Sequence, residues 1–253
     1  MSDDLVLFRE IQAPRAVVWR ALSQPEGLAL WTADEVSGDV RRGGSLRLAW
    51  PALGAETTLD VVELDAGERV AFDDGDTRVT LAPTRGGVEL RQAGTLFDRP
   101  GLASSWALAL AHLGHALEVH PGRRRTATWV HRTVRVTPEL AHLHFTEPRL
   151  LSQWLGRPAE LGRVGEPISL DLPGLGALSG RVLVREPGRD LAFTWQQLGD
   201  AVVALRTLPG GSPGTRVVAL TVSRYDAARP VPLPGLAELD ASLARLAALL
   251  AQS

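Results

Sequence analysis

The sequence predicts an α+β protein of two tandem domains, each an antiparallel sheet with two short helices and one long C-terminal helix. Three observations predict this fold. The sequence contains an internal repeat offset by 123 residues, short strand-like runs separated by turn residues, and an apolar helical stripe near the end of each repeat. A period this long corresponds to a whole domain rather than to one unit of a solenoid.

The repeat extends over four segments that occur in the same order in both halves. Residues 9–31 align without a gap to residues 132–154, and the segments 38–48, 59–72 and 101–117 correspond to 162–172, 180–193 and 235–250. The matched pairs in the first segment include Arg9 with Arg132, Ile11 with Val134, Leu22 with Phe145, Pro25 with Pro148, and Trp31 with Trp154. Ordered matches of this kind indicate a duplicated domain.

The boundary between the halves is predicted near residues 120–128. Pro121 and Gly122 are typical of the end of a helix, and Arg123–Arg125 follow as three consecutive charged residues. We therefore expect a first domain at 1–120, a linker at 121–128 and a second domain at 129–253. The arginines are interpreted as a solvated linker, with a basic docking patch as the alternative.

Each half has the same predicted order of elements. In the first half, residues 4–12 indicate a strand, residues 14–22 and 25–31 indicate two short helices that start at Pro, and several short runs up to residue 97 indicate an antiparallel meander. The last segment changes to helical periodicity and should cover the apolar face of the sheet. Its apolar stripe is Leu102, Trp106, Ala109, Leu110, Leu113 and Leu117, and its counterpart is Leu236, Leu239, Leu243, Leu246, Ala247 and Leu250.

The start of the first half resembles a known family. Residues 9–31, REIQAPRAVVWRALSQPEGLALW, and the later RRGGSLRL resemble Hsp90-ATPase-activator-homologue (AHSA1-type) domains of the Bet v 1-like, or START/SRPBCC, superfamily. The second half keeps Trp154 but has His142 in place of Trp19, and Pro167-Ile168 in place of Gly43-Gly44. The resemblance implies two helix-grip domains, each a curved sheet around a long helix, often with a cavity between them. It does not imply one activity, because members include carriers of hydrophobic ligands, cyclases and domains of Hsp90 co-chaperones.

Composition excludes several kinds of function. The formal charge of −2 argues against general attraction to nucleic acid or to anionic membranes. The absence of Cys excludes disulfides and zinc-thiolate sites, and the absence of Lys excludes Schiff-base chemistry and a P-loop lysine. Because no apolar run approaches a membrane-spanning length and the N-terminus lacks a basic leader, we expect a soluble, cytoplasmic protein.

No residues form a recognisable catalytic or metal-binding pattern. His112 and His115 are three residues apart, but the helical wheel places His115 toward solvent, and His142 and His144 cannot face one site. The acidic cluster Asp73, Asp74 and Asp76 is typical of a turn. The sequence therefore predicts no catalytic residue, no metal and no cofactor, and it favours a protein that is not an enzyme.

The candidate ligand-binding residues are tryptophans, leucines and two arginines. Arg9 and Arg132 share the strand face of apolar neighbours, where an arginine needs an anionic partner. This partner is either a ligand carboxylate or a carboxylate on a neighbouring strand, unless a bulge turns the arginine outward. The aromatic and aliphatic candidates could equally be ordinary core. They are Trp50 and Trp195 on strands, and Trp106, Leu110, Leu113, Leu239 and Leu243 on the long helices.

The leading functional hypothesis is non-catalytic binding of a small apolar or amphipathic molecule in one or both helix-grip cavities. We expect the more open pocket in the first domain, where the family pattern is better preserved. One alternative is contact with another protein, such as regulation of an Hsp90-type chaperone, which rests on an analogy of fold. The other is a cyclase- or hydrolase-like enzyme acting on a polyketide-like molecule.

Overall fold

The computed structural model describes residues 4–94, 98–226 and 232–252. The chain forms two compact units, residues 1–125 and residues 126–253. No helix within the described ranges combines the length and the apolar character that crossing a membrane requires.

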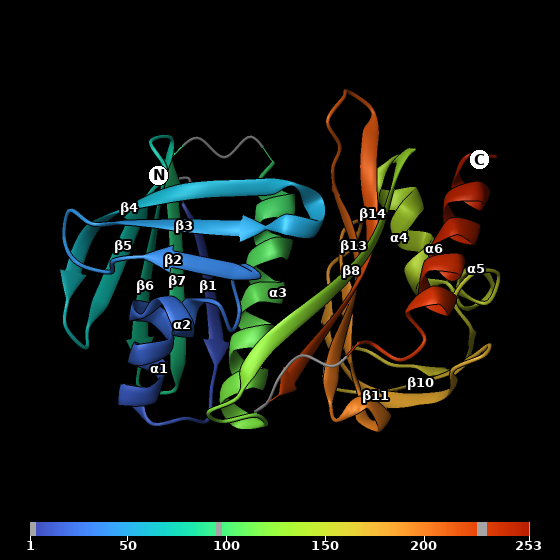
Figure 1. Ribbon diagram of the computed structural model, residues 1–253, viewed down its shortest axis with the longest axis horizontal. Coiled ribbons are helices and arrows are strands. Elements are labelled where there is room, and N and C mark those ends of the chain that lie inside the picture. Colours follow the sequence, from blue (N-terminus) through green and yellow to red (C-terminus); the bar gives the residue numbers. More distant parts are fainter. Residues whose placement is uncertain (1–3, 95–97, 227–231, 253) are drawn as a thin grey trace. The chain divides into compact units, whose positions relative to one another are not determined.

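The first unit is a seven-stranded antiparallel sheet with three α-helices. It begins with β1 (Leu5–Glu10), α1 (Arg15–Ser23) and α2 (Pro25–Leu28), and it ends with α3 (Arg99–Glu118). Between them lie β2 (Glu35–Gly38), β3 (Ser45–Trp50), the 3₁₀ turn η1 (Pro51–Leu53), β4 (Ala55–Asp65), β5 (Arg69–Asp73), β6 (Thr77–Thr84) and β7 (Gly87–Gly94). The strand order is β1-β7-β6-β5-β4-β3-β2, and α3 lies against one face of this sheet (Figure 1).

The second unit repeats this arrangement element by element. It comprises β8 (Arg124–Arg135), α4 (Pro138–Thr146), α5 (Pro148–Leu151), β9 (Arg157–Leu161), β10 (Pro167–Leu172), β11 (Gly176–Arg185), β12 (Leu191–Trp195), η2 (Gln196–Leu198), β13 (Ala201–Pro209), β14 (Thr215–Asp226) and α6 (Leu236–Leu250). The strand order β8-β14-β13-β12-β11-β10-β9 is the same as in the first unit. Each unit thus has the predicted helix-grip fold.

Local sequence explains where the helices begin. Helices α2, α4 and α5 each carry Pro in the first turn, where its missing N–H costs no hydrogen bond. Thr137 caps α4 by accepting from the Leu140 N–H, and Asp98 caps α3 by accepting from the Gly101 N–H. These caps fix the entry of the chain into the helices that cover the sheet.

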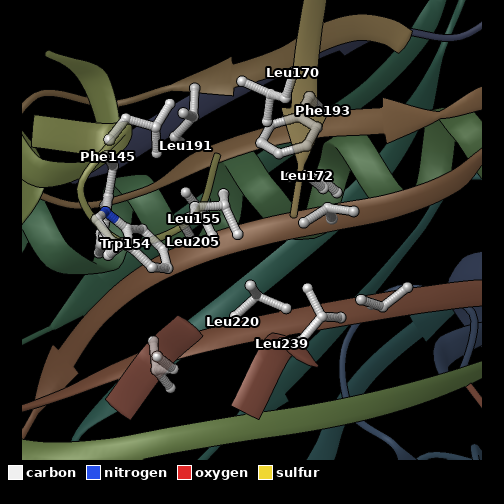
Figure 2. Close-up of a cluster of buried hydrophobic side chains, with 14 of the residues drawn as sticks. Phe145, Trp154, Leu155, Leu170, Leu172, Leu191, Phe193, Leu205, Leu220 and Leu239 are labelled. Atoms are coloured by element: carbon white, nitrogen blue, oxygen red, sulfur yellow. The ribbon is translucent and has the colours of Figure 1, made fainter. Parts of the chain in front are cut away.

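Each unit has its own core between the sheet and the helices. In the first unit the core joins Leu22 and Trp31 to Leu46, Phe72 and Leu113. In the second, Phe145 of α4 packs against Trp154, with ring centroids 6.2 Å apart, and Leu239 of α6 lies beside Leu220 of β14 (Figure 2). The helix-facing side of each sheet is therefore the concave, apolar side.

The duplication is visible in single hydrogen bonds. The Trp31 Nε1–H donates to the carbonyl of Ala21 at 3.1 Å, and the Trp154 Nε1–H donates to that of His144 at 2.9 Å. These four residues are the pairs that the alignment of residues 9–31 with 132–154 matches. The same buried indole therefore ties the turn after the second short helix to the first short helix in both units.

One part of the sequence alignment was wrong. The Gly43 N–H donates to the Val61 carbonyl and the Gly165 N–H to the Val182 carbonyl, so Gly165-Glu166, and not Pro167-Ile168, correspond to Gly43-Gly44. Gly43 and Gly165 have φ of 76° and 87°, a left-handed conformation that glycine adopts without strain. The error arose because the second unit has a different number of residues in the preceding loop.

The arginines at the predicted linker have different environments. Arg123 and Arg124 are exposed, and β8 already begins at Arg124. The Arg125 side chain, by contrast, is only 6% exposed, and its guanidinium pairs with Asp34 at 3.0 Å and donates to the Ala33 carbonyl. The expectation of three solvated arginines is therefore wrong for Arg125, because a carboxylate and a carbonyl replace its water.

The helical stripes face the sheets, with one exception. Leu110 and Leu113 of α3 are buried, as are Leu239 and Leu243 of α6. Leu246 and Leu250 are buried too. Leu236, at the first position of α6, is 40% exposed because the helix starts beyond the edge of the core.

We predict that replacing Leu113 or Leu243 by Ala lowers the free energy of unfolding of its unit by about 2–5 kcal/mol, because each substitution leaves a cavity in a closed core. Leu236→Ala is the matched control on the same helix as Leu243, and it should change stability by less than about 0.5 kcal/mol. Chemical denaturation followed by tryptophan fluorescence measures these values. Equal effects at Leu236 and Leu243 would contradict the packing of α6.

His142 stands where the first unit has Trp19. It lies on α4, is 8% exposed and packs edge-on against Phe145, with ring centroids 6.3 Å apart. Burial lowers the pKa of His142 below its ordinary value, the nearby Arg185 lowers it further, and Asp190 offsets part of this decrease. This environment favours the neutral imidazole, as suits an aromatic replacement in a core.

A lowered His142 pKa makes stability depend on pH in one direction. Below the unfolded value of 6.5 the unfolded chain binds a proton that the folded state resists, so stability from this residue is lost as pH falls. Unfolding measured between pH 7.5 and pH 5.5 should show a steeper loss in the wild-type protein than in His142→Phe. Identical pH slopes in the two proteins would contradict this account of His142.

Candidate ligand-binding site

Side-chain exposure in the first unit rises toward one end of the concave face. On α3, Leu113 and Leu110 are 0% and 2% exposed, whereas Ala109, Trp106 and Leu102 are half-buried. On β3, Leu46 and Leu48 are 0% and 7% exposed, whereas Trp50 is half-buried. Large apolar side chains that face the core but stay partly exposed are candidates for contact with a ligand.

Both gradients run toward the same end of the sheet. Trp106 bonds to Gln92, which stands near the end of β7, and antiparallel pairing leads from there through Val79 and Phe72 to Val61 of β4. Trp50, at the end of β3, pairs with Ala55, which lies six residues farther along β4 in the same direction. Trp50 and Trp106 therefore lie toward the same end of the concave face, and both pack against the core of the first unit. We call this end, formed by Trp50, Leu59, Thr77, Gln92 and Trp106, the first-unit mouth.

The Trp106 ring is held in place by a polar chain. Its Nε1–H donates to Gln92 Oε1 at 2.7 Å, and Gln92 Nε2 donates to Thr77 Oγ1 at 3.1 Å. Gln92 is only 5% exposed, so its amide is buried and bonded at both ends. The centroid of the Trp106 ring lies 6.4 Å from that of buried Trp31, at a tilt of 49°. The mouth thus has a rigid aromatic wall.

Sequence reasoning missed Gln92 and Thr77. The signal was present in β7, where Val88, Leu90 and Gln92 alternate onto one face and the last of them is polar. A polar residue that continues an apolar strand face needs a buried partner.

Arg9 does not join the mouth. It is half-buried on the face of β1 that meets α3, and its Nε lies 3.6 Å from where a side chain at Gly114 would begin. Gly114 follows Trp106 by eight residues, about 12 Å along the helix at about 1.5 Å per residue. The candidate residues suggested one pocket with an aromatic wall and an arginine. The first unit does not have this arrangement, because Arg9 meets α3 at a different height from Trp106.

The second-unit candidates lie in a more closed core. Trp195, Leu239 and Leu243 are 7%, 3% and 0% exposed and belong to one apolar cluster. Strand pairing places Leu172, which is 3% exposed, at the position that Trp50 occupies in the first unit. The second unit therefore has no equivalent of the aromatic wall at Trp50.

Arg132 already has an anionic partner. Its Nη2 donates to both carboxylate oxygens of Asp240 on α6, at 2.8 and 2.9 Å. The parity argument correctly required a carboxylate, but it comes from the covering helix and not from a neighbouring strand. Both side chains are part-exposed, so we treat the pair as a helix–sheet contact of modest energy.

The acidic cluster has the role expected of turn residues. Asp73 accepts from the Gly75 N–H, and Asp74 accepts from the Asp76 and Thr77 N–H groups. The hydrogen bond from Gly75, together with that from Arg78, lowers the pKa of Asp73. Within the described part of the chain, no group of three or more His, Asp or Glu side chains could hold a metal ion.

Comparisons with known proteins agree with the fold. The family model of Activator of Hsp90 ATPase homolog 1-like protein matches residues 12–118. No curated protein matches the chain.

Several solved structures are similar at low sequence identity. DynU16, a protein in the dynemicin biosynthetic locus, is 20% identical, with 99% of this chain and 100% of DynU16 covered and a TM-score of 0.40. The di-domain ARO/CYC BexL of the BE-7585A biosynthetic pathway is 15% identical, with 99% of each chain covered and a TM-score of 0.42. Protein SSP2350 from Staphylococcus saprophyticus is 20% identical, with 46% of this chain and 91% of that chain covered and a TM-score of 0.41.

Residues 12–118 of the first unit thus match the model of the Activator of Hsp90 ATPase homolog 1-like family, and the second unit repeats the helix-grip arrangement of the first.

Proposed function

We propose that the protein binds a small apolar or amphipathic molecule at the first-unit mouth and does not transform it. The observation that supports this most directly is the exposure gradient. Trp50 and Trp106 face the concave side of the sheet yet remain half-buried, while the opposite end of the same face is closed. Burying the remaining aromatic surface under a ligand would be favourable.

The polar chain at Trp106 suits binding. Because Gln92 satisfies the indole N–H and Thr77 satisfies the Gln92 amide, the ring presents an apolar face with no hydrogen-bonding demand of its own. A wall that is fixed before the ligand arrives lowers the entropic cost of binding. Recognition at this mouth therefore rests on apolar contact.

Contact with another protein is the second candidate, and one observation favours it. Val6 and Phe8 are 47% and 60% exposed on edge strand β1, on the side opposite to the core. Exposed apolar residues on an edge strand are typical of a surface that meets a partner. The experiment below includes this surface as its control.

We predict that Trp106→Ala weakens the binding of N-phenyl-1-naphthylamine, an uncharged apolar fluorophore, by about fivefold, because one aromatic contact is lost. Phe8→Ala is the matched control, since it removes an aromatic ring outside the mouth. Fluorescence titration of the full-length protein measures both, with circular dichroism as the check on folding. If Phe8→Ala weakens binding and Trp106→Ala does not, the outer face of β1 binds the probe and the proposed function is wrong.

A further inference from the structure

The buried indole N–H of Trp195 has no acceptor among the residues that the structure describes. Trp195 is 7% exposed, and its Nε1 is a buried atom with no hydrogen-bond partner. Buried polar groups in folded proteins are nearly always bonded, because leaving a donor unsatisfied away from water is costly. The Trp195 N–H therefore marks a position where an acceptor belongs.

Strand pairing shows what surrounds this N–H. Trp195 of β12 stands opposite Ala201 of β13, and the pairing of Val202 with Ser223 places Arg224 of β14 on the other side of Ala201. Trp195, Ala201 and Val222 belong to the core cluster, so alternation puts Arg224 on the same concave face, where it is 8% exposed. Asp226 follows on that face, and its Oδ2 is buried and accepts no hydrogen bond.

The first unit has internal acceptors at the equivalent place. Val61 pairs with Phe72 in the first unit, as Val182 pairs with Phe193 in the second. On the next strand, Phe72 pairs with Val79 and Phe193 pairs with Val203, so Val79 and Val203 occupy equivalent positions. It follows that Thr77 corresponds to Ala201, and Gln92 to Val222.

The two units therefore differ in whether a neighbouring side chain accepts the indole N–H of the tryptophan at this end of the concave face. In the first unit, Gln92 accepts from Trp106 and Thr77 accepts from Gln92. In the second unit, alanine and valine stand at both of those positions, so neither side chain can accept from Trp195.

We propose that the second unit binds an apolar molecule carrying an oxygen acceptor, and that this oxygen accepts the Trp195 Nε1–H. The inference rests on the proposed function for the apolar part of the ligand and extends it to a second site with different chemistry. The first-unit mouth binds an apolar ligand through apolar contact alone, and the second site binds an apolar ligand that also carries an oxygen acceptor.

The test compares two probes that share one apolar skeleton. 8-Anilinonaphthalene-1-sulfonate differs from N-phenyl-1-naphthylamine by its sulfonate. Trp195→Phe keeps an aromatic ring and removes only the N–H donor. In the full-length protein it should weaken binding of the sulfonate probe by about tenfold and leave the uncharged probe within about twofold, because only the former has the oxygen acceptor.

Ala201→Ser gives an independent readout that retains Trp195. It adds a hydroxyl directly across from Trp195 and supplies the internal acceptor that the first unit has in Thr77. Ala201→Ser should weaken binding of the sulfonate probe by about threefold, since the Trp195 N–H then has an acceptor within the protein.

The outcomes separate this inference from the proposed function. Equal effects on both probes, or none on either, in both variants would overturn the second site. So would an ordered water on Trp195 Nε1 that persists at saturating sulfonate probe. The uncharged probe's response to Trp106→Ala is unaffected by these results and tests the first-unit mouth alone. If neither probe binds the wild-type protein, both proposals are wrong.

Discussion

The structure of each unit depends on covering a wide apolar sheet with one narrow helix. Seven strands spaced about 4.8 Å apart span about 30 Å, whereas a helix with its side chains is only about 10 Å wide. The sheet must therefore curve around the helix, and the two short helices must close one end of the concave face. The other end is left to large side chains, and this is where Trp106 and Trp195 lie.

The two units meet this constraint with different side chains on the same topology. The first unit leaves Trp50 and Trp106 half-buried and satisfies the Trp106 indole internally through Gln92. The second unit closes the same end with Leu172 and Trp195, and its described residues provide no acceptor for the Trp195 indole N–H. Duplication thus preserved the scaffold, including the Trp31 and Trp154 hydrogen bonds, while the chemistry of the open end changed.

Periodicity and the repeat predicted the two domains and the order of their elements, because strand alternation and helical stripes are local patterns that burial enforces. The family resemblance predicted the helix-grip arrangement of those elements. Periodicity and the repeat also placed Leu113 and Leu243 in the core. They could not show that Arg132 bonds Asp240, that Arg125 is buried, or that Gln92 holds Trp106, because each contact joins side chains on different elements whose pairing the local patterns do not fix. Strand register, which sequence leaves open, decides which polar side chain meets which indole.

The most direct test of this account follows the indole N–H signals of the seven tryptophans by ¹⁵N-resolved NMR as N-phenyl-1-naphthylamine is added. If the probe enters at the first-unit mouth, the signals of Trp50 and Trp106 shift, because their half-buried rings contact it. Trp154, 1% exposed in the closed core of the second unit, keeps its position. A titration that moves Trp154 and leaves Trp50 and Trp106 unchanged would contradict the account.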